Sequence, residues 1–197
     1  TSWRDERSWR AVLNWGNDLG NNRPPGAYFE RFFPVGMLGS IVTATGDNMR
    51  QGRKKPDRAE LLQLFGYIMA MSLQDVPGPR AAYWQQDTPP DAIYPGPNLG
   101  RFGMTNSRFE EILSALRLCN YTEDDHTADA WVPVREFVGA VNDTWAHAVS
   151  PGVYQCVDES MSSWKGLDAK ADDGMAHVQK IARKPKGVGA EIMGVWA

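Results

Sequence analysis

Apolar residues recur at helical spacing through most of the first 150 positions of the chain. The clearest case is 57–73, where leucines and other apolar residues follow one another at i, i+3 and i+4. Asp57 precedes this run as a candidate N-cap, and Glu60 stands three residues later, which is the spacing of a capping box. Because apolar residues cover nearly all faces of this helix, we predict that it is buried.

Similar but weaker patterns predict four more helices, at residues 5–15, 34–46, 106–118 and 134–149. Thr105 or Ser107 is the candidate cap of the third of these. Three stretches between the helices are predicted to be loops, at residues 20–27, 76–100 and 123–129. The first two are rich in proline and glycine, and the last is acidic and predicted to be solvated.

The pattern changes after Gly152, where short runs typical of β-strands replace the helical spacing. We predict strands at residues 153–157, 176–183 and 190–196. The sequence thus indicates an α+β protein, mostly helical at first and then opening a sheet. We place a domain boundary near residue 150, with one domain at 1–150 and another at 151–197.

Composition is that of an ordinary globular protein, with 42% hydrophobic and 23% charged residues in 197. Cys119 and Cys156 are the only cysteines and belong to no CxxC pattern, which argues against a zinc site and suits a reducing, intracellular compartment. No apolar run reaches the length of about 20 residues that a membrane span needs. The apolar run that ends the sequence, 191–197, leads us to expect that the natural chain continues beyond it.

The net charge of −3 conceals a basic first segment. Residues 1–58 contain 10 Lys and Arg against 6 Asp and Glu, whereas residues 59–150 contain 5 against 12. Two clusters of cations are candidates for phosphate contacts with DNA. The first is Arg50, Arg53, Lys54, Lys55 and Arg58, and the second is Lys180, Arg183, Lys184 and Lys186. Solvated loops or a soluble strand edge would explain these clusters equally simply.

Asp158 is a candidate metal ligand, because it lies at the end of a predicted strand before a Ser-rich turn and Lys165, although an exposed Asp-Glu pair at a strand end is more often simply solvated. A carboxylate there suits a hard cation such as Mg²⁺. Adjacent residues of a strand point to opposite faces, so Glu159 is not expected to join Asp158 in one clamp. The same alternation disfavours a hydrolase that uses these two carboxylates as a catalytic pair.

Six short segments in order give the chain a family resemblance that runs from about residue 29 to 197. They are 57–66 (DRAELLQLFG), 79–84 (PR followed by YW), 104–113 (MTNSRF with IL), 157–161 (VDESM), 165–166 (KG) and 184–189 (KP with Gly189). Together they resemble piggyBac-type transposases of the DDE superfamily. Glu191 departs from the family pattern, which more often has a basic residue there.

This resemblance implies a helical dimerisation and DNA-binding domain up to about residue 150, followed by the first strands of a ribonuclease-H-like catalytic domain. It implies that Asp158 is the first of three carboxylates that hold two Mg²⁺ or Mn²⁺ ions. The other two are expected beyond Ala197, so the chain alone is expected not to nick DNA. Asp172 and Asp173 are predicted to lie in a turn.

The implied partner is double-stranded DNA, both the transposon ends and a TTAA target. The parent is expected to be a homodimer in the nucleus, with no membrane association. Lys165 joins the two basic clusters as a candidate DNA contact. The alternative is a domesticated or decayed remnant that serves as a non-catalytic DNA-binding or dimerisation module.

Overall fold

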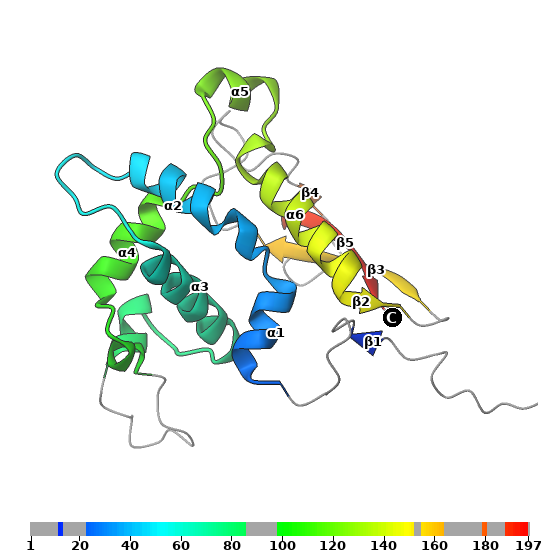
Figure 1. The fold of residues 1–197 in the computed structure, drawn as a ribbon, viewed down its shortest axis with the longest axis horizontal. Helices are drawn as coiled ribbons and strands as arrows, with labels where there is room; N and C mark the ends of the chain where they lie inside the picture. The colour runs from blue at the N-terminus through cyan, green and yellow to red at the C-terminus, as the bar shows by residue number, and fades with distance from the viewer. Residues whose placement is uncertain are drawn as a thin grey trace, which may run out of the picture. The chain divides into compact units, whose positions relative to one another are not determined.

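The computed structural model of this chain describes residues 12–13, 23–85, 98–151, 155–163, 179–180 and 188–196. Helices fill most of the described part before residue 149, and strands follow (Figure 1). The helices are α1 (Pro25–Phe32), α2 (Leu38–Asp47), α3 (Arg58–Leu73), α4 (Asn106–Ala115), α5 (Glu123–Ala128) and α6 (Val132–Ala148). Short 3₁₀ turns are η1 (Val35–Met37), η2 (Arg80–Trp84) and η3 (Leu99–Phe102). The strands are β1 (Val12–Leu13), β2 (Val149–Ser150), β3 (Cys156–Ser163), β4 (Gln179–Lys180) and β5 (Val188–Trp196).

The chain divides into two compact units. Unit 1 comprises Thr1–Phe33, Asp124–Trp131 and Gly139–Ala197. Unit 2 comprises Pro34–Glu123 and Val132–Val138. The assignment of domains to 1–150 and 151–197 stays a prediction.

Unit 2 is built around a hydrophobic core that α2, α3 and α4 share with the short turns η2 and η3. Phe109 of α4 is buried against the rings of Tyr67 and Trp84, with centroid distances of 6.1 and 5.1 Å, and those two rings also contact each other at 5.7 Å. The Tyr67 hydroxyl donates to the Leu99 carbonyl at 2.9 Å and accepts from the Met104 amide at 3.3 Å. A buried hydroxyl with partners on both sides ties the irregular segment to the helices.

The capping prediction for α3 is confirmed. The Asp57 side chain accepts from the Glu60 amide at 2.8 Å, and the Glu60 carboxylate accepts from the Asp57 amide at 3.2 Å. The prediction that α3 is buried holds on one face only, because Leu73 is 87% exposed and Met69 50% exposed. Apolar residues on all faces make full burial of a helix possible. In unit 2, however, the packed elements cover only the face of α3 that carries Leu61, Leu64 and Tyr67.

Helix α4 begins as predicted, with Thr105 as its cap, but ends at Ala115 rather than at residue 118. Side chains of the segment that ends α2 bind the backbone there. The Thr45 hydroxyl donates to the Arg117 carbonyl and accepts from the Arg117 amide, both at 3.2 Å, and the Asn48 amide donates to the Ala115 carbonyl at 3.0 Å. These bonds replace the helical hydrogen bonds that would have continued α4.

Unit 1 contains two small antiparallel sheets and the helices α1 and α5. β3, β5 and β4 pair in that order, and β1 pairs with β2. Within this unit, Arg31 of α1 donates to the His147 carbonyl at 2.6 Å, and the Trp145 indole donates to the Phe32 carbonyl at 2.9 Å. The part of α6 that belongs to unit 1 is thereby joined to α1.

Several local predictions were wrong. Val12–Leu13 is a strand rather than part of a helix, because it pairs with Val149–Ser150; the rest of 5–15 lies outside the described residues. Residues 25–27 of the loop predicted at 20–27 are helical, because a proline at the first helical position is compatible with the start of α1. Residues 123–128 are also helical, with acidic residues at the helix start, where they favour the helix dipole.

Candidate nucleic-acid interface and catalytic strand

β3 carries Asp158 as its third residue, and the strand runs on for five residues after it. The predicted position at a strand end before a turn was therefore wrong. Residues 160–163 form a ladder with β5 instead, because eight consecutive register pairs, from Cys156↔Trp196 to Ser163↔Gly189, outweigh the turn preference of serine. Of the predicted strand at 153–157, Cys156 and Val157 belong to β3, and residues 153–154 lie outside the described residues. Of the predicted strand at 176–183, only Gln179–Lys180 is a described strand.

The surroundings of Asp158 suit a ligand. The residue is exposed, as are Cys156 and Val157 beside it. Its register partner on β5 is Gly194, so no side chain stands directly across from the carboxylate in the ladder. The β3–β5 ladder fixes the backbone under Asp158, while its carboxylate reaches solvent.

A carboxylate oxygen is the donor type that Mg²⁺ and Mn²⁺ prefer, so Asp158 fits such an ion as one ligand. Within the described residues, however, no three His, Cys, Asp or Glu side chains gather at one point. The described part of the chain therefore supplies at most part of a metal site.

The first basic cluster lies in residues 50–58, which connect α2 to the first residue of α3, Arg58, and which we call the 50–58 segment. Its cations are exposed, with side-chain exposures of 63% for Arg53, 71% for Lys54 and 67% for Lys55. Each of these three has a carboxylate neighbour. The pairs are Arg53–Glu111 at 3.2 Å, Lys54–Glu60 at 3.5 Å and Lys55–Asp47 at 2.7 Å.

Arg50 and Arg58 differ from these three cations. Both are exposed, and in the part of the chain that the structure describes neither has a carboxylate within ion-pair distance. Exposed ion pairs contribute only about 0–1 kcal/mol, so a phosphate can exchange for the carboxylate in the other pairs. The whole segment can therefore offer positive charge to an anion, with Arg50 and Arg58 the most readily available.

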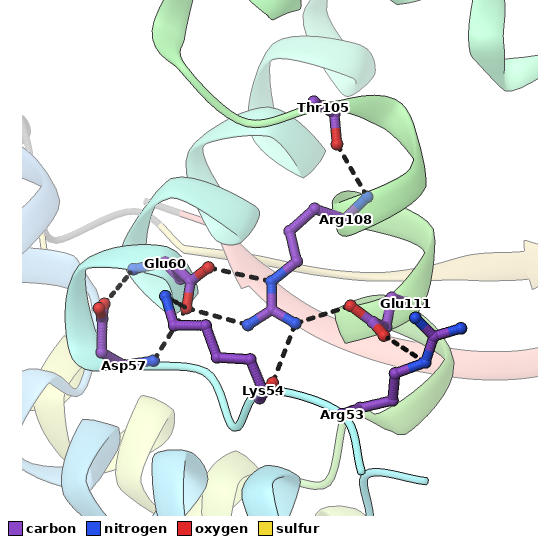
Figure 2. Close-up of polar contacts among 7 residues, drawn as sticks. All are labelled: Arg53, Lys54, Asp57, Glu60, Thr105, Arg108 and Glu111. Atoms are coloured by element: carbon purple, nitrogen blue, oxygen red, sulfur yellow. Dashed lines mark hydrogen bonds and ion pairs between the residues drawn. The ribbon is translucent and has the colours of Figure 1, made fainter.

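Arg108 of α4 fastens this segment to the helices, and Figure 2 shows its guanidinium at the centre of the network. It binds Glu60 through two parallel hydrogen bonds, from Nε to Oε1 at 2.9 Å and from Nη2 to Oε2 at 3.0 Å. Its Nη1 donates to Glu111 Oε2 at 2.7 Å and to the Lys54 carbonyl at 3.0 Å. Arg108 is only 16% exposed, so these bonds form in a largely desolvated place.

The network shifts the titration of both partners in the bidentate pair. The hydrogen bond from Arg108 is the main reason that the pKa of Glu60 lies below its usual value of 4.5, although burial opposes the shift. The same bond raises the pKa of Arg108. Both groups are therefore charged over the whole neutral range, and bidentate geometry makes the pair specific for arginine.

An open groove of about 800 Å³ lies beside the network. Arg50, Arg53 and Arg108 line it, together with hydroxyl groups of Thr105 and Ser107 at the start of α4. Two carboxylates also line it, those of Glu110 and Glu111. Arg80 Nη1 donates to both carboxylate oxygens of Glu110, each at 2.8 Å, so Glu110 belongs to a different pair.

The second basic cluster is largely outside the described residues. Lys165, Arg183, Lys184 and Lys186 fall there, as do Asp172 and Asp173. Lys180 is described as part of β4, opposite Val188 of β5. The DNA contacts predicted for Lys165, Lys180, Arg183, Lys184 and Lys186 stay predictions.

Sequence reasoning missed the part played by Arg108. The residue stood in a segment that carried the family resemblance, but nothing in its local pattern distinguishes it from a solvated arginine. The usable signal was its position next to Phe109, near the start of a capped helix. An arginine beside a buried residue is itself partly buried, and a partly buried arginine is usually paired. Its main partner, Glu60, is 48 positions away in the sequence.

Comparison with known proteins gives two findings. A family model described as Transposase IS4 matches residues 24–192. The cryo-EM structure of a piggyBac transposase synaptic complex with hairpin DNA superimposes with a TM-score of 0.67 at 16% identity. This match covers 89% of the present chain and 36% of that chain. Among curated proteins, none matches the sequence.

These findings bear on the predictions. The predicted kinship with piggyBac-type transposases is confirmed, as is the α+β fold class with a helical part followed by strands. The present chain spans about a third of the length of the matched piggyBac chain. Among the described helices, none has the length and apolar character that crossing a bilayer requires.

Proposed function

This chain belongs to the transposase IS4 family, and from that premise we propose that it forms part of a piggyBac-like DNA transposase that binds element ends and cleaves and transfers DNA strands. The observation that carries the proposal is the extent of the family match, because residues 24–192 include both the 50–58 segment and Asp158. The proposal concerns the whole protein, of which this chain supplies the helical part and the first catalytic strands.

We assign Asp158 as the first of three carboxylates of a site for Mg²⁺ or Mn²⁺. Its exposed position on β3, opposite a glycine, supports this role. Bound in pairs, such ions activate the attacking oxygen and stabilise the leaving one. Asp158 itself would hold one metal position fixed relative to the backbone of the sheet.

We assign the 50–58 segment to binding of duplex DNA, with Lys165, Lys180, Arg183, Lys184 and Lys186 as further candidate contacts. The segment's exposure and its two cations that have no carboxylate neighbour among the described residues support this assignment. The same proposal includes rejoining of DNA at TTAA target sites by the whole protein. It also includes a homodimeric whole protein and a nuclear location.

Cleavage of element-end DNA with Mg²⁺ tests the catalytic assignment in the full-length protein that carries this chain. We expect Asp158→Asn to abolish cleavage and leave DNA binding intact, because the substitution keeps shape but removes the anionic ligand. Asp75→Asn is the matched control, since Asp75 is an exposed aspartate outside β3. Cleavage at the normal rate in Asp158→Asn would contradict the assignment. A wild-type protein that binds DNA without cleaving it would support the non-catalytic remnant instead.

The salt dependence of duplex binding tests the assignment of the 50–58 segment. We expect Arg50→Gln and Arg58→Gln each to weaken binding uniformly across sequences and to reduce the salt slope by about 1. Arg101→Gln is the control, because Arg101 is exposed but lies over the Phe102 ring outside the segment. Equal effects of all three substitutions would show that the segment has no special part.

A further inference from the structure

We propose that Arg108 is a positioning residue for DNA binding by the 50–58 segment, acting on the segment's cations without touching DNA itself. The proposal rests on the proposed function and adds Arg108, which is not among the residues assigned to DNA contact. Arg108 is 16% exposed, whereas Arg53 and Lys54 are 63% and 71% exposed. A DNA backbone on this surface therefore meets the lysine and arginine of the segment first.

Two carboxylates compete with DNA for those cations. Glu111 lies 3.2 Å from Arg53, and Glu60 lies 3.5 Å from Lys54 (Figure 2). Arg108 occupies both carboxylates at shorter distances, 2.7 Å to Glu111 and 2.9 Å to Glu60. The guanidinium thus neutralises the two groups that would otherwise hold the segment's own cations.

The charges of this cluster show what Arg108 contributes. Arg53, Lys54 and Arg108 are positive and Glu60 and Glu111 are negative, so the cluster has a net charge of +1. Without Arg108 it would be neutral, and each remaining cation would face a carboxylate with no other partner in the cluster. The attraction between opposite charges would then be stronger than in the intact network, and phosphate would compete less well.

The geometry also lets Arg53 change partners at low cost. Arg53 binds Glu111 Oε1, while Arg108 binds the other oxygen, Oε2. When Arg53 moves to a phosphate, Glu111 keeps its bond to Arg108, so no carboxylate is left unpaired in a partly buried place. Arg108 also holds the Lys54 carbonyl at 3.0 Å, which fixes the backbone of the segment before DNA arrives.

The test measures binding of this chain to a fluorescent duplex across a salt series, for four variants. Arg108→Gln should weaken binding about three- to tenfold. Glu111→Gln should tighten it by a similar factor and steepen the salt slope by about 1, because Arg53 loses its carboxylate. Glu110→Gln is the matched control, since it removes the same charge from the same groove but from the Arg80 pair.

The double variant Arg108→Gln with Glu111→Gln separates positioning from other roles. It restores the net charge of +1, so affinity should return to near the wild-type value. Glu111→Gln should also tighten binding by a larger factor in the Arg108→Gln background than in the wild type, because Glu111 then pairs with Arg53 alone. A direct DNA contact by Arg108, or a purely structural role, would give the same factor in both backgrounds, and that result would overturn the proposal. Equal effects of Glu111→Gln and Glu110→Gln would also overturn it.

Folding and the proposed function are checked separately. Circular dichroism of each variant shows whether Arg108→Gln still folds, and Glu111→Gln keeps the proposal testable if it does not, because a glutamine can still accept from Arg108. Failure of the wild-type chain to bind duplex DNA at low salt would refute the DNA-binding assignment itself. Normal wild-type binding with no rescue in the double variant would refute only the role of Arg108.

Discussion

The helical core of unit 2 and strand β3 of unit 1 are held in place by different forces. In unit 2, residues such as Phe109, Leu61 and Leu64 are at most 1% exposed and pack against one another. In β3, Val157 is 64% exposed and Asp158 is exposed, so that part of the strand is held chiefly by its backbone ladder with β5. Packing fixes the surface that is proposed to bind DNA, whereas strand register fixes the residue proposed to bind metal.

This difference matters for how each region responds to mutation. A side chain in the unit 2 core cannot change without leaving a cavity or an unpaired group, and the Arg108 network is supported by that core. A side chain on the exposed part of β3 can change with little effect on folding, so its chemistry can be altered separately from its position.

The largest expected effect is in the core. Phe109→Ala should lower the free energy of unfolding of unit 2 by about 3–5 kcal/mol, because it leaves a cavity beside Tyr67 and Trp84. Val157→Ala should change stability by less than about 1 kcal/mol. Urea unfolding followed by tryptophan fluorescence checks both. A similar loss of stability at the two positions would contradict the view that side-chain packing holds unit 2 and backbone pairing holds β3.

Tyr67→Phe is the next test and separates packing from hydrogen bonding. The ring stays, but the Leu99 carbonyl and the Met104 amide lose their partner in a buried place. We expect a loss of about 1–3 kcal/mol, measured by the same unfolding experiment. A loss near zero would mean that water can reach these groups.

Asp57→Ala removes the cap of α3 and should cost about 1 kcal/mol. Asp57→Asn should cost less, because its amide oxygen can still accept from the Glu60 backbone. Because Glu60 takes part in both the capping box and the Arg108 pair, the alanine variant should also weaken DNA binding slightly. Thermal unfolding and the duplex-binding assay together check this, and equal stability of the two variants would argue against the cap.

The smallest expected effect is a pH dependence of stability. The pKa of Glu60 is lowered from 4.5 in the folded chain, so its stabilising contribution is complete above that pH and disappears as the pH falls through the folded value. The difference in unfolding free energy between the wild type and Glu60→Gln should therefore shrink below about pH 4.5. Urea unfolding from pH 7 to pH 3 measures it; a difference that grew with acid would have the wrong sign.

Regular helices with strong local signals could be predicted from the sequence. The 57–73 prediction gave α3 almost residue for residue, because the capping box and the apolar spacing are both local. The start of α4 followed from Thr105 for the same reason. The loops predicted at 20–27 and 123–129 were wrong at 25–27 and 123–128, which are helical. A proline at a helix start and a short acidic helix both resemble loop sequences.

The strands were harder to predict because pairing decides them. β1 exists only through its pairing with β2, whose residues lie more than 130 positions later. The serine-rich residues after Asp158 become strand because β5 offers them a complete ladder, and no local signal in 160–163 announces this. Asp158 could be chosen from the sequence as the candidate ligand, but not its place within the strand.

By itself, the sequence determined the capped helices, the family, the candidate carboxylate and the presence of five cations in residues 50–58. Only the tertiary structure decided which of those cations have carboxylate neighbours and which do not. The reason is that the deciding partners come from elsewhere in the chain: Arg108 and Glu111 reach the 50–58 segment from α4, about fifty positions away. A sequence gives the number of charged residues. Whether a charge can bind a ligand depends on which side chains the fold places next to it.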